Sequence, residues 1–425
     1  MQDCTAQVYR PRRPQTTDFY RILEKYFDTY VFTYEERFEP SCGPLRSVVR
    51  ISVEAFLGCG RPEGGFARIK CPDCKAERLL TFSCRTRWLC PSCQAKRAAL
   101  FAEKLVDDLL APVPHRHYVF TIPLALRGLF KRERRLLGLL ARCAYEAVRL
   151  CFEQLFERKD VRAGCVISLQ TAGSYAANFH PHAHCLITEG VYTGQGEFVP
   201  LPSLDTKAIE EVFRRLILRR LHQAERLSET FIERLLSWSP SGFSVHAQHL
   251  VRAEDTTRME RLARYLTKPP VPIDSVSEQD DGTVRVSTPP HPSTGRRECR
   301  LNVLDWIHAL TTHVPDPGQH TLRYFGAYAC RRRLAPRRAA SPESLENTEQ
   351  ADAQPVAKPR RSSWARLIKR LFEVDPLLCG CGGAMVVVSF ITEPKTIDHI
   401  LNHLRRKGPT LFDPSDSPEA RAPPF

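Results

Sequence analysis

Residues 178–190 read NFHPHAHCLITEG and place His182 and His184 two positions apart in an apolar, strand-like run. Side chains two apart on a strand project from the same face, so both imidazoles point the same way. Two adjacent ring nitrogens can chelate one divalent cation. Partly buried structural histidines are the alternative, and this stretch alone does not decide between the two.

A third ligand for such a cation must come from outside the pair. Gln170 lies in the preceding apolar run GCVISLQT (164–171), and Glu189 lies at the end of the histidine run. We take Gln170 as the ligand to be tested. His180 precedes Pro181, and we expect it to lie outside the strand.

The surrounding periodicity predicts an α+β fold, with alternating strands and helices. The loop that follows Pro269-Pro270, residues 269–295, is rich in Pro, Ser and Asp. Strands are expected at 117–122, 164–171, 182–188 and 243–251, and helices at 17–37, 129–158, 205–238 (one helix or a pair) and 258–268.

Tyr265 lies on the last of these helices, with Arg261 at i−4 and Lys268 at i+3. Cations on the same helical face favour the phenolate and attract phosphate. A core tyrosine that covers Pro269 is the alternative for this helix considered alone. The same chain also has a histidine pair, a cysteine block and a net positive charge, and this combination favours a functional role for Tyr265.

The cysteine block contains two Cys-x-x-Cys pairs, Cys71/Cys74 and Cys90/Cys93, separated by fifteen residues. Zinc prefers four tetrahedral thiolate or imidazole ligands, so the two pairs are expected to complete one shell. Thiols without metal are the alternative. Cys59 and Cys84 lie close enough in sequence to join a second site or to replace a ligand.

The cysteine block also carries positive charge, which favours a zinc-ordered module that binds nucleic acid. A purely structural zinc site is the alternative. Near the other end of the chain, Cys379 and Cys381 are expected either to bind metal with His399 or His403 or to pack as thiols. The cations of the block are Arg85, Arg87, Lys96 and Arg97.

The composition agrees with a polyanionic partner. The 425 residues include 62 Lys and Arg against 48 Asp and Glu, a net charge of +14, which favours nucleic acid or an acidic membrane surface. The longest uncharged stretch, residues 376–392, is short for a bilayer span and contains three glycines. We expect a cytoplasmic protein with reduced cysteines, associated with the nucleoid when bound to DNA.

Together these motifs resemble the HUH (histidine–hydrophobic–histidine) single-strand endonucleases, in particular the rolling-circle transposases of the insertion sequence ninety-one type. The resemblance covers about Phe56 to Leu404. The matching stretches are FLGCGRPEGGFARIKCPDCKAERLLTFSCRTRWLCPSCQAKR, PHRHYVFTIPLALR, LQTAGSYAANFHPHAHCLITEG, GFSVHAQ, RLARYLTKPP, HVPDPGQHTLRYFGAY and LLCGCGGAM.

This resemblance implies an antiparallel-sheet HUH palm, ferredoxin/RRM-like, with an N-terminal zinc-binding domain and a small C-terminal module. By the same resemblance His182 and His184 bind Mg²⁺ or Mn²⁺, and Tyr265 is the nucleophile. Arg264 and Lys268 are then expected to contact the phosphate or the leaving group. The two-tyrosine branch has a second tyrosine where this chain has Arg261, so a single-tyrosine member is expected.

The expected activity is nicking and rejoining of single-stranded DNA through a 5′-phosphotyrosine. The expected partners are single-stranded or hairpin DNA at transposon ends, and target DNA. A replication initiator or relaxase with the same chemistry, and a non-catalytic zinc-dependent DNA-binding protein, are the alternatives. DNA bases are expected to stack on Phe243, Tyr324 and Phe325, and core packing is the alternative role for these rings. The DNA groove is expected to be lined by Arg214, Arg215, Arg219 and Arg220, and a solvated helix face is the alternative for them.

The sequence also predicts the domain boundaries. An N-terminal helical and zinc-binding domain precedes the catalytic domain, and a basic, Pro-rich linker leads to the C-terminal Cys-containing module and a disordered tail. The expected ranges are 1–100, 101–330, 331–363, 364–410 and 411–425.

Overall fold

The computed structural model describes most of the chain, which divides into two compact units interleaved along the sequence. The first unit combines residues up to 25, residues 49–100 and residues from 348 onward. The second unit combines residues 26–48 and 101–347. The predicted linker and tail lie outside the described residues, which are 14–173, 178–202, 205–290, 295, 297–329 and 377–407.

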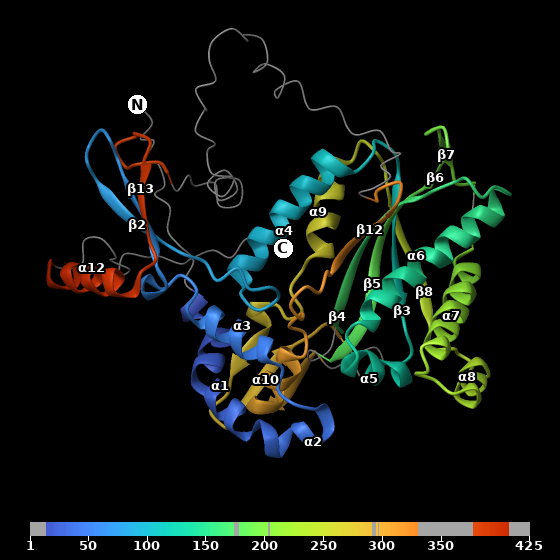
Figure 1. Cartoon of the computed structure of the whole chain (residues 1–425), viewed down its shortest axis with the longest axis horizontal. Coiled ribbons are helices and arrows are strands. Elements are labelled where there is room, and N and C mark those ends of the chain that lie inside the picture. The colour runs from blue at the N-terminus through green and yellow to red at the C-terminus, as the bar shows by residue number, and fades with distance from the viewer. Residues whose placement is uncertain are drawn as a thin grey trace, which may run out of the picture. The chain divides into compact units, whose positions relative to one another are not determined.

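A five-stranded sheet with the order β12-β4-β5-β3-β8 forms the centre of the second unit (Figure 1). All its neighbouring strands are antiparallel, which confirms a fold of helices and antiparallel sheet. The histidine run lies on β5, the middle strand. The strands are β3 (His115–Thr121), β4 (Gly164–Ala172), β5 (Phe179–Thr188), β8 (Ser244–Val251) and β12 (Leu322–Gly326).

One face of this sheet is covered by four helices, whose apolar side chains pack on Phe120, Ile167 and Cys185. The sequence left one helix or a pair open for 205–238, and the structure shows a pair; the Asp205 side chain caps the first of them by accepting from the Lys207 N–H. Figure 1 shows α6 and α7 along the sheet. The helices are α5 (Leu124–Arg132), α6 (Leu136–Leu155), α7 (Thr206–Gln223) and α8 (Glu229–Leu236).

The single helix expected over residues 129–158 is wrong, because the chain turns between α5 and α6. At this turn the buried Arg134 guanidinium donates to the Thr312 carbonyl oxygen at 2.7 Å. A buried cation requires such partners, so a long-range hydrogen bond prevails here over helical periodicity.

The opposite face of the sheet is covered by α9 (Thr256–Leu266) and the π-helical turn η3 (Leu105–Leu109). Their apolar side chains, with Ala263 and Leu266 among them, pack on Val166 and Leu186. Asp255 caps α9 by accepting from the Arg258 N–H at 2.9 Å. The last turn of α9 therefore brings Tyr265 to the face of the sheet that carries the histidine pair.

The stretch expected to be a loop, residues 269–295, instead contains two strands of a smaller antiparallel sheet with the order β11-β10-β9. The Asp281 carboxylate accepts from the Thr283 N–H, and Gly282 has a φ of 74°, so Asp-Gly forms a tight turn. The elements are η4 (Ile273–Ser275), β9 (Val276–Glu278), β10 (Thr283–Ser287), β11 (Glu298–Asn302) and α10 (Val303–Thr311); a separate hairpin joins β6 (Gly190–Tyr192) and β7 (Phe198–Pro200).

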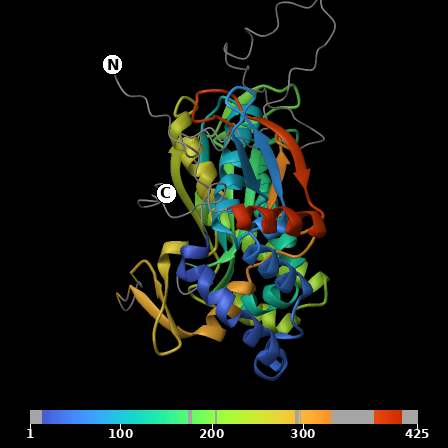
Figure 2. The same ribbon diagram turned by 90° about the vertical axis from the view of Figure 1, so that its left-hand side faces the viewer.

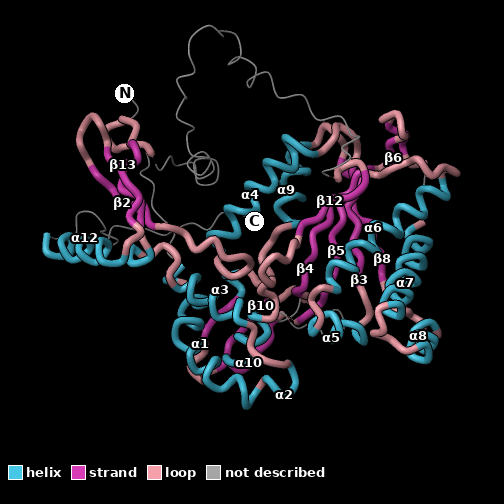
Figure 3. The backbone as a smooth tube through the Cα atoms, viewed as in Figure 1, coloured by secondary structure: helices cyan, strands magenta, loops and turns pink. Residues whose placement is uncertain are grey.

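The first unit contains a three-stranded antiparallel sheet with the order β13-β1-β2. A strand near the C-terminus therefore lies beside strands near the N-terminus, as Figures 2 and 3 show. Ile397 and Leu401 of α12 pack on Phe66 of β1. The strands are β1 (Phe66–Lys70), β2 (Glu77–Thr81) and β13 (Val386–Ile391), with the turn η2 (Pro62–Gly64) and the helix α12 (Pro394–Lys407).

The N-terminal helices include α1, which confirms the helix expected at 17–37. Across the described ranges, we find no helix with both the length and the apolar character that crossing a bilayer demands. The elements are η1 (Pro14–Thr16), α1 (Asp18–Arg37), α2 (Glu39–Cys42), α3 (Ser47–Leu57) and α4 (Pro91–Lys104).

Candidate active site and cysteine clusters

The imidazoles of His182 and His184 face each other on the central strand, with their Nε2 atoms 3.1 Å apart. Two nitrogens that bind one ion at right angles, each about 2.1 Å from it, lie ~3 Å apart. The Nε2 pair therefore has the spacing of two neighbouring ligands of one cation.

The other nitrogen of each ring is held by a neighbour. His182 Nδ1 donates to the His180 carbonyl oxygen at 2.6 Å, which leaves the Nε2 of the neutral ring as a lone pair. His184 Nδ1 lies 2.9 Å from His117 Nε2. When His184 donates through this Nδ1, its Nε2 also presents a lone pair, so both histidines fit a divalent cation.

His117 also contacts the histidine pair, a position that the sequence motifs did not predict. It lies on β3, next to β5 in the sheet, and its ring is parallel to within 20° of the His184 ring. A hydrogen bond to the second ring nitrogen, such as the one between His184 Nδ1 and His117 Nε2, fixes the tautomer of a metal-binding histidine. The signal was present in the alternation of His115 and His117, which places both on one strand face.

His180 lies inside β5, so the expectation that it precedes the strand is wrong. Pro181 has no N–H to donate to a ladder. The β4–β5 pairing shifts register between Gln170 and Ala172, and this irregularity accommodates the proline within the strand.

The two candidates for a third ligand have different surroundings. Gln170 lies directly opposite His182 across the ladder, and its Nε2 donates to the Leu266 carbonyl oxygen at 3.2 Å. Glu189 instead forms a salt bridge with Arg116, with both carboxylate oxygens 2.9 Å from Arg116 Nε. The structure thus brings Gln170, and not Glu189, next to the histidine pair, and its role as a ligand stays a prediction.

Tyr265 packs against the histidines from the last turn of α9. Its ring centroid lies 5.4 Å from that of His184 and 6.1 Å from that of His117. Tyr265 keeps 40% of its surface exposed. A residue in contact with the candidate ligands and open to solvent is accessible to a large substrate such as DNA.

Burial, together with nearby cations, keeps the histidines neutral. Burial, together with the Lys268 and Arg127 cations, lowers the pKa of His182 to about 4. Burial and the neighbouring His182 lower the pKa of His184 well below its usual value. Both imidazoles therefore have the unprotonated form that a metal requires at neutral pH.

The two predicted phosphate contacts differ in their availability. The Lys268 ammonium lies 4.5 Å from the centroid of the Tyr265 ring, beside the phenol. Arg264 forms an ion pair with Glu260 one turn earlier on α9, at 2.7 Å. Lys268 is consequently the better placed of the two, and both roles stay predictions.

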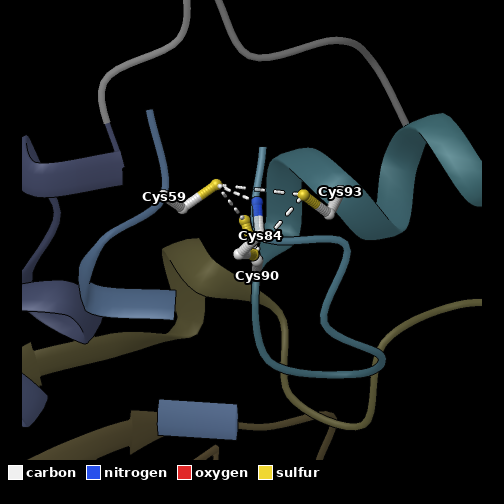
Figure 4. A group of neighbouring side chains, drawn as sticks. All are labelled: Cys59, Cys84, Cys90 and Cys93. Carbon is white, nitrogen blue, oxygen red and sulfur yellow. Dashed lines mark hydrogen bonds between the residues drawn. The ribbon is translucent and has the colours of Figure 1, made fainter. Parts of the chain in front are cut away.

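A first cluster of four cysteines joins three segments of the first unit, as Figure 4 shows. The Cys59 and Cys93 sulfurs lie 3.8 Å apart, and Cys84 and Cys93 3.6 Å apart. Contact with Cys59 and the other thiols lowers the pKa of Cys93 and raises that of Cys90, so ionisation is shared within the group. Four thiols at this spacing suit a tetrahedral zinc site.

The structure separates the two Cys-x-x-Cys pairs, and the expectation that they share one ion is wrong. Cys71 and Cys74 meet Cys379 and Cys381 in a second cluster, and His399 and His403 are not part of it. Cys71 and Cys74 lie in the turn that connects β1 and β2, whereas Cys90 and Cys93 lie beyond the other end of β2. The two pairs are therefore at opposite ends of this hairpin.

The predicted DNA-contacting side chains fall into two groups. Phe243 is buried and packs edge-to-face on Phe213, and Phe325 stacks on Tyr145 at 5.0 Å, which agrees with core packing. Tyr324 is half-buried. Among the cations of the cysteine block, Arg85 and Arg97 are exposed, whereas Arg87 and Lys96 are half-buried.

The arginines of α7 form ion pairs with carboxylates. Arg214 and Arg215 pair with Glu211, and Arg220 pairs with Glu146.

Comparisons with known proteins show two families that the chain resembles. Residues 164–335 match the family described as "Putative transposase", and residues 26–122 match the "Transposase zinc-binding domain". The histidine pair and Tyr265 lie within the first match and the first cysteine cluster lies within the second, so the chain is a transposase with a zinc-binding domain. The chain belongs to the insertion sequence ninety-one type, with an N-terminal zinc-binding domain.

Two curated relatives agree with this family. The transposase for insertion sequence element IS801 of Pseudomonas savastanoi pv. phaseolicola is 28% identical over 370 residues, 82% of this chain and 86% of that protein. The protein named "Putative transposase y4qJ" of Sinorhizobium fredii (strain NBRC 101917 / NGR234) is 25% identical over 276 residues, 60% of this chain and 68% of that protein. No solved structure matches the chain.

Proposed function

We propose that this transposase nicks and rejoins single-stranded DNA at transposon ends through a covalent 5′-phosphotyrosine on Tyr265, as in rolling-circle transposition. The observation that carries the proposal is the contact between Tyr265 and His184, with ring centroids 5.4 Å apart. It joins a solvent-accessible nucleophile to a pair of candidate metal ligands. The five-stranded sheet then serves as the HUH palm.

His182 and His184 hold a divalent cation in this proposal, Mg²⁺ or Mn²⁺, through their Nε2 atoms, with Gln170 as the third ligand. The bound ion supplies Lewis-acid polarisation of the scissile phosphate and offsets charge that develops on it. The chain contributes the neutral state of both imidazoles and their fixed orientation, which come from burial and from the His117 and His180 hydrogen bonds.

The chemical step exchanges one phosphate ester for another. The Tyr265 phenol oxygen forms a bond to phosphorus and gives up its proton, while the bond to the 3′ oxygen breaks and that oxygen gains a proton. The products are a 5′-phosphotyrosine and a free 3′-OH. A 3′-OH can later attack this adduct and release Tyr265, so rejoining needs no external energy source.

Lys268 is the residue placed to assist the phenol. Its ammonium lies over the Tyr265 ring, 4.5 Å from the centroid, where a positive charge attracts the DNA phosphate. Arg261, four residues before Tyr265, is exposed on the same helical face. A single tyrosine flanked by cations supports one nucleophile that is used twice in succession.

The test is a covalent-adduct assay with single-stranded DNA from the ends of the element. The protein attaches to the fragment downstream of the nick, so a 3′ label must move to the protein band on a denaturing gel. A 5′ label must appear on a shorter free strand. Both results require Mg²⁺ or Mn²⁺.

Variants decide which residue carries the adduct. Tyr265→Phe and His182→Ala are expected to abolish it. The matched control is Tyr145→Phe, because the buried Tyr145 hydroxyl has no hydrogen-bond partner among the described residues and lies on the far face of the sheet. An adduct that persists in Tyr265→Phe, or forms without metal, rejects the proposal.

A further inference from the structure

The second cysteine cluster joins the two ends of the first unit. Cys71 and Cys74 belong to the segment between β1 and β2, whereas Cys379 and Cys381 belong to the segment before β13. The zinc-binding family match ends at residue 122 and so includes only the first two. We propose that these four cysteines bind a second zinc ion, which fastens the C-terminal segment to the N-terminal sheet.

The sulfur positions suit this ion. Cys71 Sγ lies 3.6 Å from Cys381 Sγ, and Cys74 Sγ lies 3.4 Å from Cys379 Sγ. All four sulfurs lie within 4.8 Å of one another. Zinc–sulfur bonds of about 2.3 Å in a tetrahedron set the sulfurs about 3.8 Å apart, close to the observed separations.

Both loops that carry the thiols are held by their own backbone. In the first, the Cys71 N–H donates to the Ala76 carbonyl oxygen at 2.8 Å, and the Lys75 N–H donates to the Cys71 carbonyl oxygen. In the second, the Cys379 N–H donates to the Gly383 carbonyl oxygen at 2.8 Å. Two preformed turns that each present a pair of thiols resemble two halves of one zinc shell.

Gly383 shows how closely the two loops approach. A Cβ atom added at this position would lie 3.1 Å from Cys71 Sγ and 2.1 Å from an Asp73 carboxylate oxygen. The exposed Asp73 carboxylate can move aside, whereas the buried Cys71 sulfur would have to shift by a few tenths of an ångström to admit a side chain at residue 383. The glycine thereby allows the thiols of the two segments to come together.

The sheet sets the register of the cluster. β13 pairs antiparallel with β1, and Lys70 lies opposite Val386 at the end of the ladder. The next residues on each side lead directly into the two cysteine loops. Buried Ile69 and Met385 pack together with Cys71 and Cys379, so the thiols meet at the end of a paired and packed region.

Exposure distinguishes this site from the first cluster. Cys74 and Cys381 are exposed, whereas the cysteines of the first cluster are buried or half-buried. A chelator can reach an ion with exposed ligands more easily. We therefore expect the second site to release its zinc before the first.

The experiment measures zinc in the purified full chain by elemental analysis. The wild type is expected to contain two zinc ions per chain, and the double variant Cys379→Ser/Cys381→Ser one. Cys84→Ser/Cys93→Ser is expected to lose the other ion and retain one. The control Cys299→Ser, outside both clusters, keeps two. One ion in the wild type, or two in Cys379→Ser/Cys381→Ser, overturns the proposal.

A second measurement separates ligand loss from misfolding. Cys381→His replaces an exposed thiolate with another zinc ligand. It must keep two ions, and its cobalt-substituted form must show weaker thiolate-to-cobalt absorption than the wild type. Retention of a single ion by Cys381→His, an unchanged cobalt spectrum, or a disulfide within the cluster rejects the site.

Discussion

The Tyr265 ring stands edge-on to the His184 ring, with the two planes at 87° and the centroids 5.4 Å apart. The two residues come from different elements, α9 and the central strand β5. Their contact depends on the end of α9, where the Leu266 carbonyl oxygen accepts hydrogen bonds from both Ser168 and Gln170 of β4. The position of the candidate nucleophile is thus set by the strand beside the histidines.

Gln170→Leu tests whether this glutamine binds the cation or only holds α9. Loss of a ligand is expected to raise the Mn²⁺ concentration needed for half-maximal adduct formation at least several-fold. Loss of the hydrogen bond to Leu266 alone lowers the free energy of unfolding by about 1 kcal/mol. Metal titration and urea unfolding measure the two effects separately, and Ser168→Ala serves as a control that removes only a bond to α9. An unchanged Mn²⁺ requirement in Gln170→Leu excludes it as a ligand.

His117→Phe removes the partner of His184 Nδ1 and leaves the ring size nearly the same. Residues that orient a metal-binding histidine typically contribute roughly 10- to 100-fold to metal affinity. We expect a shift of this size in the Mn²⁺ titration of adduct formation. His222→Asn is the control because His222 is an exposed histidine on α7, which packs on the other face of the sheet. Equal Mn²⁺ requirements in His117→Phe and wild type would remove His117 from the site.

The pH dependence of stability reports on His182. Its pKa is lowered by burial to about 4, below the ordinary value of 6.5, so protons bind the unfolded chain more readily. This contribution to the free energy of unfolding is complete above pH 6.5 and is lost as the pH falls toward 4. In metal-free protein, His182→Gln is expected to give a flatter stability profile between pH 6.5 and 4. If the free energy of unfolding of His182→Gln depends on pH as that of the wild type does, the pKa of His182 is not lowered by burial.

Lys268 and Arg264 are expected to differ in their effect on the rate of nicking. Lys268 lies against the Tyr265 ring, whereas Arg264 is paired with Glu260. Removing one charge that stabilises a transition state costs about 10²- to 10³-fold in rate. Single-turnover kinetics should show a loss approaching this size for Lys268→Ala, and a much smaller one for Arg264→Ala. The reverse order would place Arg264 at the phosphate.

Local patterns predicted the elements of the site well. The spacing of His182 and His184 placed both on one face because the period of a strand depends only on neighbouring residues. The helix that carries Tyr265 followed from apolar spacing and from the proline pair that ends it. These features need no knowledge of the rest of the chain.

Contacts between distant segments decided what the sequence did not predict. The partition of the cysteines depends on β13 pairing with β1, across more than 300 residues. The contribution of His117 depends on β3 lying next to β5. The hairpin at Asp281-Gly282 had a local signal, an Asp-Gly turn between alternating residues, that the Pro, Ser and Asp content of the stretch obscured.

The pairing of β13 with β1 also orders events during translation. A ribosome makes β1 and β2 early, then the whole five-stranded sheet, and only afterwards β13. Until β13 is made, the nascent chain has an unpaired edge at β1, and Cys71 and Cys74 lack their two partner cysteines. The histidine pair and Tyr265 are already synthesised at that stage. Messages cut short by premature stop codons would yield products that contain the histidine pair and Tyr265 but lack the strand that completes the amino-terminal sheet.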